Sequence, residues 1–173
     1  LPPSAIDAST NTTDVQRTPA RLRGRRLALV EEPREGMPLR EGAVKWFTGD
    51  DRLVGRLLYQ EPLAFWPQHK LVLRANHRPV IIGTDDGIWR RILLAQFDAH
   101  FEGAKRDQGL QQYLATHELS GILNWAQVGA AEWYFNGLQV PADVHAATDS
   151  YRSEEDRLAQ FFDEHTKVEP GAV

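Results

Sequence analysis

The chain has 173 residues, of which 42% are hydrophobic and 25% are charged, and it contains no cysteine. This size and composition fit one soluble domain, or one domain with an appendage, and exclude disulfide bonds and thiolate metal sites. No apolar run reaches membrane-spanning length and no signal peptide is recognisable, so we expect a cytoplasmic protein without a membrane partner.

The formal net charge of −4 conceals an uneven distribution. Residues 1–106 carry 17 Lys/Arg and 13 Asp/Glu, a net charge of +4. Residues 107–173 carry 3 Lys/Arg and 11 Asp/Glu, a net charge of −8. A basic first half is compatible with a nucleic-acid partner but does not require one.

The first stretch, residues 1–16, is small, polar and proline-bearing, which is typical of a flexible leader. It begins with Leu1 rather than Met, so we expect a fragment of a longer protein. A short helix is predicted after it, with Thr18 as N-cap and Pro19 at the first helical position. The arginines around this helix are expected to be solvated rather than to grip a phosphate.

Three short apolar runs, at residues 27–30, 71–73 and 92–95, are typical of strands buried on both faces of a parallel sheet. Polar residues adjoin each run, and ligands of open α/β sheets bind beyond the carboxyl ends of the strands. The candidate site residues are therefore Glu31, Glu32, Asn76, Arg90 and Arg91.

Adjacent carboxylates after an apolar strand are typical of a Walker B motif. One carboxylate orients the water shell of Mg²⁺ and the other polarises the attacking water. Two simpler interpretations stay open. Glu31 and Glu32 could lie in a solvated turn, and Asn76 could begin an ordinary turn that ends at Pro79.

Between the first two runs, residues 41–47 are predicted to form a helix. Residues 52–59 and 63–66 are predicted to form a β-hairpin, either purely structural or in contact with nucleic acid. His69 and His77 flank the second run without a third ligand at suitable spacing, so no metal site is predicted.

The last part of the chain is predicted to be helical. Short helices are expected over residues 108–114 and from Pro141 onward, with a restart near Ser153. Residues 118–135 show helical periodicity, with Gly137 as a C-cap. We expect its apolar stripe to lie in a core: Leu119, Ile122, Leu123, Ala126, Ala130, Trp133 and Tyr134.

Several motifs occur in a fixed order: RLRGRRLALVEEPREG, then KWFTGDD, then LLYQEPLAFWPQHKLVLRANHRPVIIGTDDGIWRRILLAQF. Through them the chain resembles the superfamily 3 helicase domain of phage and plasmid primase-helicases, which are relatives of the poxvirus primase-helicase. The resemblance covers roughly residues 21–162, weakly so through GILNWAQVGAAEW and YRSEEDRLAQFF.

This resemblance implies an α/β fold of the P-loop NTPase type: a partial AAA+-like core with parallel strands and a β-hairpin, followed by a helical segment. The domains would be a leader (1–16), the ATPase part (17–106), the helical segment (107–165) and a tail (166–173). The whole protein would use ATP and Mg²⁺, form a ring, usually hexameric, and translocate on single-stranded DNA during replication.

The resemblance also implies roles for single residues. Glu32 would activate water, Glu31 would serve Mg²⁺ through water, and Asn76 would be the sensor 1 residue. Arg91, helped by Arg90, would be the arginine finger that acts across a subunit boundary. The residues expected at or near the DNA-contacting hairpin are Lys45, Arg52, Arg56 and Tyr59.

The chain departs from the family in two places. The phosphate loop GxxxxGK[ST] is missing, since no Gly-Lys pair occurs anywhere. Gln60 and Glu61 stand at the hairpin tip, where relatives often place a basic residue. Without a loop to hold the phosphates, we predict that this chain alone does not hydrolyse ATP. The alternatives are a non-catalytic DNA-binding or assembly module, such as a degenerate prophage remnant, and a structural domain without a ligand.

Overall fold

The computed structural model describes residues 1–10, 13–31, 33–57 and 59–165. Its residues group into two compact units. The first unit comprises Leu1–Leu93 together with the segment from Asp149 onward, and the second comprises Leu94–Thr148.

The first unit contains every strand of the described part of the chain. Its strands are β1 (Leu27–Glu31), β2 (Leu53–Gly55), β3 (Leu63–Phe65) and β4 (Lys70–Arg74). Its helices are α1 (Thr13–Leu22), α2 (Glu41–Phe47), α3 (Asp86–Trp89), α7 (Arg157–His165) and a 3-10 turn at Pro3–Ala5. The second unit contains α4 (Leu110–His117), α5 (Leu119–Asn136) and a 3-10 turn at Gly103–Lys105. Helix α6 (Ala142–Glu155) begins in the second unit and ends in the first.

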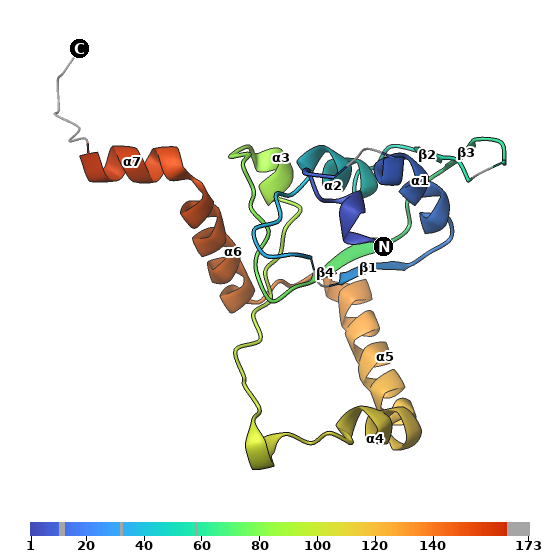
Figure 1. Ribbon diagram of the computed structural model, residues 1–173. Coiled ribbons are helices and arrows are strands. Elements are labelled where there is room, and N and C mark those ends of the chain that lie inside the picture. The colour runs from blue at the N-terminus through green and yellow to red at the C-terminus, as the bar shows by residue number, and fades with distance from the viewer. Residues whose placement is uncertain (11–12, 32, 58, 166–173) are drawn as a thin grey trace. The chain divides into compact units, whose positions relative to one another are not determined.

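Strands β1 and β4 form a parallel pair, in which Leu27 lies opposite Lys70 and Glu31 opposite Arg74 (Figure 1). The Lys70 N–H donates to the Arg26 carbonyl at 2.9 Å and starts the ladder. Both predicted strands are confirmed, and the small parallel sheet among helices agrees with the α/β prediction. The more specific assignment to the P-loop fold stays a prediction.

The two-stranded sheet is covered on one face. Along β1 the side chains alternate between exposed and buried, so that Ala28 and Val30 enter the core while Leu27 and Leu29 do not. Helices α1, α2 and α3 lie on the covered side (Figure 1). The prediction that these strands are buried on both faces is therefore wrong for the described part of the chain.

Two further predictions are confirmed. Helix α2 covers the predicted residues 41–47 and buries Ala43, Val44 and Phe47. Strands β2 and β3 pair antiparallel, with Leu53 opposite Phe65, and form the predicted hairpin.

The third predicted strand, residues 92–95, is wrong because this segment is not a strand. It follows α3 directly, and the Ile92 N–H still donates to the Trp89 carbonyl at 3.1 Å. The Leu94 N–H donates to the Thr148 hydroxyl at 2.9 Å instead of joining a ladder. An apolar run without a partner strand does not become a strand, whatever its composition.

The predicted start of the first helix is also wrong. Helix α1 begins at Thr13, so Pro19 lies inside it and Thr18 is not its N-cap. The packing of α1 against β2 explains why a proline is tolerated inside this helix. The two elements are so close that a Cβ added to Gly55 of β2 would lie 2.8 Å from the Cβ of Pro19. The close contact between α1 and β2 thus outweighs the intrinsic cost of a proline in a helix.

Residues 1–10, predicted to be a flexible leader, pack against the rest of the first unit. Ala5, Ile6 and Asp7 are buried, and Asp7 forms a β-bridge with Leu39. Asp7 is fixed by bonds from Ser9 and from Arg34. These hydrogen bonds lower the pKa of the Asp7 carboxyl although its burial opposes them. The small polar residues therefore build a bonded turn.

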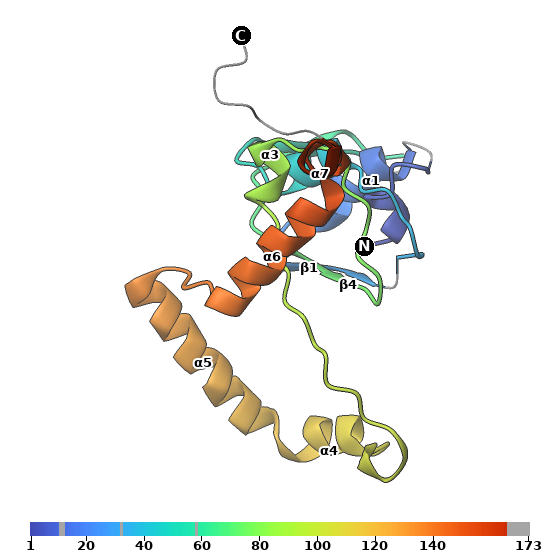
Figure 2. The ribbon, with the colours of Figure 1, turned by 90° about the vertical axis from the view of Figure 1, so that its left-hand side faces the viewer.

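In the second unit, α4 and α5 are joined by a sharp bend (Figure 2). The predicted C-cap is confirmed, because Gly137 has a φ of 71° and its N–H donates to the Trp133 carbonyl at 2.9 Å. The predicted core position of the α5 stripe is wrong: no residue of α4 or α5 is buried. No helix in the described ranges combines the length and the apolar character that crossing a membrane requires.

Candidate functional site

The carboxyl ends of β1 and β4 lie at the same edge of the parallel pair. Glu31 is the last residue of β1, and its carboxylate pairs with the Arg74 guanidinium at 2.6 Å. Both side chains are more than half exposed, so this pair stabilises the fold by no more than about 1 kcal/mol. Asn76 follows β4 by two residues and is exposed. Glu31 thus ends one strand and Asn76 comes shortly after its neighbour, at the same edge, while the roles assigned to them stay predictions.

Glu32, the residue predicted to activate water, lies outside the described residues. Its role stays a prediction from the sequence.

The two predicted finger arginines differ in their surroundings. Arg91 is partly buried, its Nη1 donates to the Gly87 carbonyl at 2.5 Å, and its buried Nε has no partner among the described residues. Arg90 is exposed at the end of α3. No hydrogen bond or ion pair within the described ranges joins either arginine to Glu31 or Asn76.

The hairpin of β2 and β3 carries a fully exposed aromatic side chain, that of Tyr59. Tyr59 is 99% exposed and has a φ of 62°, a left-handed conformation that non-glycine residues seldom adopt. Arg56 Nε donates to the Gln60 carbonyl at 2.8 Å, and Arg52 contacts the Ala64 carbonyl at 3.4 Å. Trp66, the residue after β3, is exposed as well, so the segment 52–66 carries two exposed aromatic side chains and two exposed arginines.

Lys45 was predicted with the hairpin residues, but it lies on α2 and is already paired. Its ammonium is 2.9 Å from the Asp85 carboxylate and 3.9 Å from Glu41. The hydrogen bond from Lys45 lowers the pKa of Asp85. Lys45 is therefore less available to an anionic ligand than Arg52 or Arg56.

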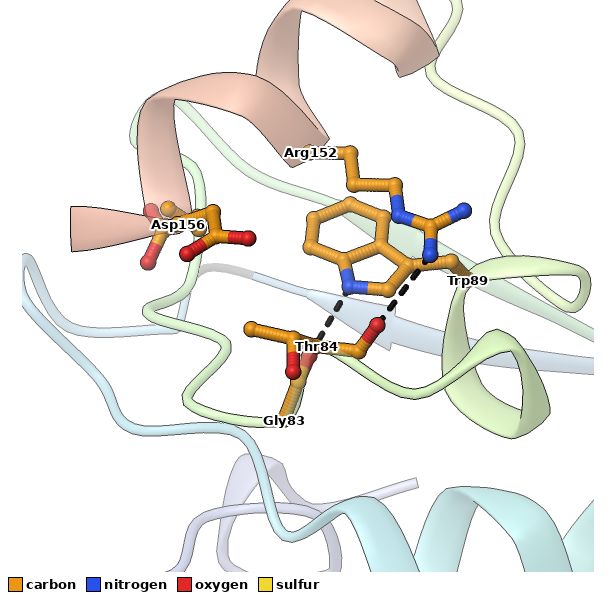
Figure 3. Close-up of a pocket in the computed structure, with 6 residues that line it drawn as sticks. Gly83, Thr84, Trp89, Arg152 and Asp156 are labelled. Atoms are coloured by element: carbon orange, nitrogen blue, oxygen red, sulfur yellow. Dashed lines mark hydrogen bonds between the residues drawn. The ribbon is translucent and has the colours of Figure 1, made fainter. Parts of the chain in front are cut away.

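The segment 83–86 is held from both sides. The Gly83 N–H donates to Glu41 at 2.6 Å, while its carbonyl accepts from Trp89 Nε1 at 2.8 Å. Arg152 of α6 donates to the Thr84 carbonyl at 3.1 Å (Figure 3). It also donates to the Asp86 carboxylate at 2.7 Å. These bonds fix α3, the short helix that precedes both arginines.

Beside this segment lies a recess of about 10 Å³, hardly room for one water molecule, which Trp89 and Arg152 line with Asp156 (Figure 3). Small-molecule sites usually enclose about 300–1,000 Å³. The recess is therefore too small for a nucleotide.

Two buried features escaped the sequence analysis. Tyr151 of α6 donates to the Pro79 carbonyl and packs edge-on against Trp89, with the Arg78 guanidinium 5.0 Å from its ring centre. His69 is buried, and neither of its ring nitrogens has a hydrogen-bond partner in the described structure. Nothing in the local sequence announces either environment, since both arise from contacts between distant segments. No metal-binding cluster of acidic or histidine side chains occurs among the described residues.

No protein-family model matches the chain. A protein of Acanthamoeba polyphaga mimivirus, named "Putative helicase L207/L206", is 39% identical over 88 residues. The similarity covers 49% of this chain, and the chain spans 9% of the length of that relative. About half of the chain is thus related to a small part of a viral protein named as a helicase.

Proposed function

We propose that this chain is a piece of an ATP-dependent DNA helicase of the superfamily 3 type. The observation that carries the proposal is the similarity to the mimivirus protein named as a helicase. The parallel pairing of β1 and β4 supports it, because Glu31 and Asn76 follow neighbouring strands at one edge, where α/β proteins bind their ligands.

In this proposal the edge serves ATP hydrolysis. Glu32 polarises the attacking water, Glu31 holds Mg²⁺ through its water shell, and Asn76 orients water against the γ-phosphate. Carboxylate and amide oxygens suit Mg²⁺. In this proposal Glu31 gives up its exposed ion pair with Arg74, at 2.6 Å, when the hydrated ion binds. The sequence has no Gly-Lys pair of a phosphate loop. In this proposal, another part of a longer protein supplies the loop that holds the phosphates of ATP.

The arginine finger is assigned to Arg90 rather than to Arg91. Arg90 is exposed and free to extend toward a neighbouring subunit. Arg91 is tied to Gly87 within its own chain and holds the end of α3. The finger requires a ring of subunits, as the resemblance implies, which in this proposal is hexameric.

The hairpin is proposed to contact single-stranded DNA during replication. Arg52 and Arg56 supply positive charge for the phosphates, and Tyr59 supplies an exposed ring on which a base can stack. Lys45 has a lesser part because Asp85 neutralises it.

The test is DNA-dependent ATP hydrolysis by a longer protein, in which this chain follows a segment with a phosphate loop. We expect Glu32→Gln to abolish turnover while nucleotide binding persists. Glu35→Gln, a substitution at an exposed acid three residues further along, is the matched control and should leave turnover intact. Unchanged turnover in Glu32→Gln would refute the Walker B assignment.

A second candidate is a non-catalytic DNA-binding module. The exposed hairpin favours it, and so does the missing phosphate loop. It predicts binding that falls steeply with salt and does not respond to ATP. An effect of ATP on DNA affinity in the longer protein would favour the helicase.

A further inference from the structure

The segment around α1 is densely basic. Residues 17–30 contain five arginines and neither Asp nor Glu, a net charge of +5. All five arginines are exposed, and none pairs with a carboxylate among the side chains that the structure describes. They are Arg17, Arg21, Arg23, Arg25 and Arg26. Protein surfaces normally intersperse charges of both signs, so an unpaired run of one sign favours an anionic ligand.

Arg17 and Arg21 lie on the outer side of α1. They are four residues apart and therefore share one side of the helix. Thr18 and Leu22, which are also four residues apart, are each 2% exposed and face the interior of the first unit. The helix is thus anchored through one side and presents two guanidinium groups on another.

Helix α1 lies beside the hairpin of β2 and β3 (Figure 1). A Cβ added to Gly55 of β2 would lie 2.4 Å from the Ala20 nitrogen. Arg21 follows Ala20 and Arg56 follows Gly55 in the chain, so bond geometry keeps the Cα atoms of these two arginines within about 13 Å of each other. The arginines of α1 and of the hairpin therefore belong to the same part of the first unit.

Most of the positive charge near the hairpin comes from α1. Residues 51–61, which include the hairpin tip, carry two arginines and two acids and so have no net charge. Residues 17–30 carry +5. Because positive charge dominates the affinity of proteins for a phosphate backbone, α1 rather than the hairpin supplies most of the attraction.

Single-stranded nucleic acid fits this surface better than other anions do. Arginine binds phosphate through two parallel hydrogen bonds. Proteins that bind single strands combine a basic track with exposed aromatic rings on which bases stack. Tyr59 supplies such a ring, since it is 99% exposed. An acidic peptide or a free phosphate has no base to stack on it.

We propose that a single strand whose base stacks on Tyr59 continues across α1, where Arg17 and Arg21 bind its phosphates. This inference rests on the proposed DNA contact of the hairpin and extends it by a second contact area. Arg23, Arg25 and the neighbouring Arg26 add to the field that attracts the strand.

The salt dependence of DNA binding tests the contact on α1. Affinity of the 173-residue chain for a fluorescent oligothymidylate is measured by anisotropy at several salt concentrations. On logarithmic axes, affinity falls with salt by a slope of about 0.7 for each phosphate that the protein neutralises. We expect Arg17→Gln/Arg21→Gln to reduce this slope by about 1.4 and the affinity about tenfold at about 0.1 M salt.

The matched control is Lys105→Gln/Arg106→Gln, which removes the same charge from two exposed residues of the second unit. It is expected to keep the slope of the wild type. All substituted side chains are exposed, so equal unfolding midpoints in urea are expected and show that each variant is folded. An unchanged slope in Arg17→Gln/Arg21→Gln, or an equal reduction in the control, would overturn the contact on α1.

Tyr59→Gly, measured in parallel, separates the two contact areas. Stacking releases no counterions, so this variant is expected to bind more weakly with an unchanged slope. The slope therefore reports on α1 and the loss of affinity in Tyr59→Gly reports on the hairpin. No binding by the wild-type chain at low salt would overturn this proposal, whereas ATP hydrolysis by the longer protein tests the helicase separately.

Discussion

Tyr59 combines exposure with backbone strain. An L-residue in the left-handed region is less stable by about 1–2 kcal/mol, and Tyr59 recovers none of this through burial because it is 99% exposed. Residues held in such conformations cluster at functional sites. The hairpin tip therefore fits a contact surface better than a stabilising element.

Replacing Tyr59 by Gly should separate stability from binding. Glycine adopts a φ of 62° without strain, so the free energy of unfolding in urea is expected to rise by about 1 kcal/mol. Affinity for a fluorescent oligothymidylate, measured by anisotropy, is expected to fall about fivefold or more because a stacking ring is lost. Tyr59→Phe should keep both properties. A glycine variant that binds DNA as tightly as the wild type would contradict the role of this ring.

His69 makes the folded state sensitive to pH. Burial lowers the pKa of His69 below its usual 6.5, and the neighbouring Lys70 lowers it further. The unfolded chain therefore binds the proton more tightly than the folded chain. The contribution of His69 to stability is complete above pH 6.5 and is lost as the pH falls below it.

His69→Leu should flatten this dependence. Between pH 7.5 and 5, the free energy of unfolding of the wild type is expected to fall more steeply than that of the variant, by at most about 1.4 kcal/mol per pH unit. Urea titrations at several pH values measure the free energy of unfolding of both proteins. Because both contain the same carboxylates, the contributions of these groups cancel in the difference between the two proteins. Parallel curves for the two proteins would show that His69 titrates normally.

At the scale of elements, the contact between α1 and β2 depends on Gly55. A Cβ at this position would press against the backbone of Ala20 and the ring of Pro19, neither of which can rotate away. We expect Gly55→Ala to lower the free energy of unfolding by about 1–3 kcal/mol. Gly42→Ala is the matched control, since nothing lies within 4 Å of its added Cβ on α2. Equal stability of the two variants in urea would mean that α1 and β2 are not in close contact.

The elements that the sequence predicted correctly are those with local causes. Periodicity located α2 and α5, and short apolar runs bounded by polar residues located β1 and β4. The failures have non-local causes. Residues 92–95 form no strand because they have no partner strand in the described structure. The segment around Asp7 is ordered because Asp7 accepts a hydrogen bond from Arg34, which lies 27 residues further along the chain.

The candidate site shows the same division. The positions of Glu31 and Asn76 after neighbouring strands followed from strand composition. The difference between Arg90 and Arg91 could not follow from sequence, because adjacent arginines are chemically identical. The fold distinguishes them: Arg91 is partly buried and donates to the Gly87 carbonyl, whereas Arg90 is exposed. The pairing of Lys45 with Asp85, 40 residues apart, was equally hidden.

At the scale of the whole molecule, charge separates two regions. The hairpin and the edge of the parallel sheet lie in the part with a net charge of +4, while residues 107–173 carry −8. We therefore expect DNA to approach through the first unit, which holds both features. The relative named as a helicase is far longer than this chain, which covers 9% of it.

The account depends on the parallel alignment of β1 and β4, which places the acidic end of one strand beside the amide end of the other. The chain has no cysteine, so pairs of introduced cysteines can test this alignment without interference. In Glu31→Cys/Arg74→Cys, a short bis-maleimide is expected to link the two positions within one chain, because the native side chains touch at 2.6 Å. In Glu31→Cys/Lys70→Cys the second cysteine lies about 13 Å further along β4, beyond the reach of the reagent. Efficient linkage in the first variant and none in the second is the predicted result. The reverse pattern would mean that the strands run antiparallel, and that Glu31 and Asn76 do not share an active-site edge.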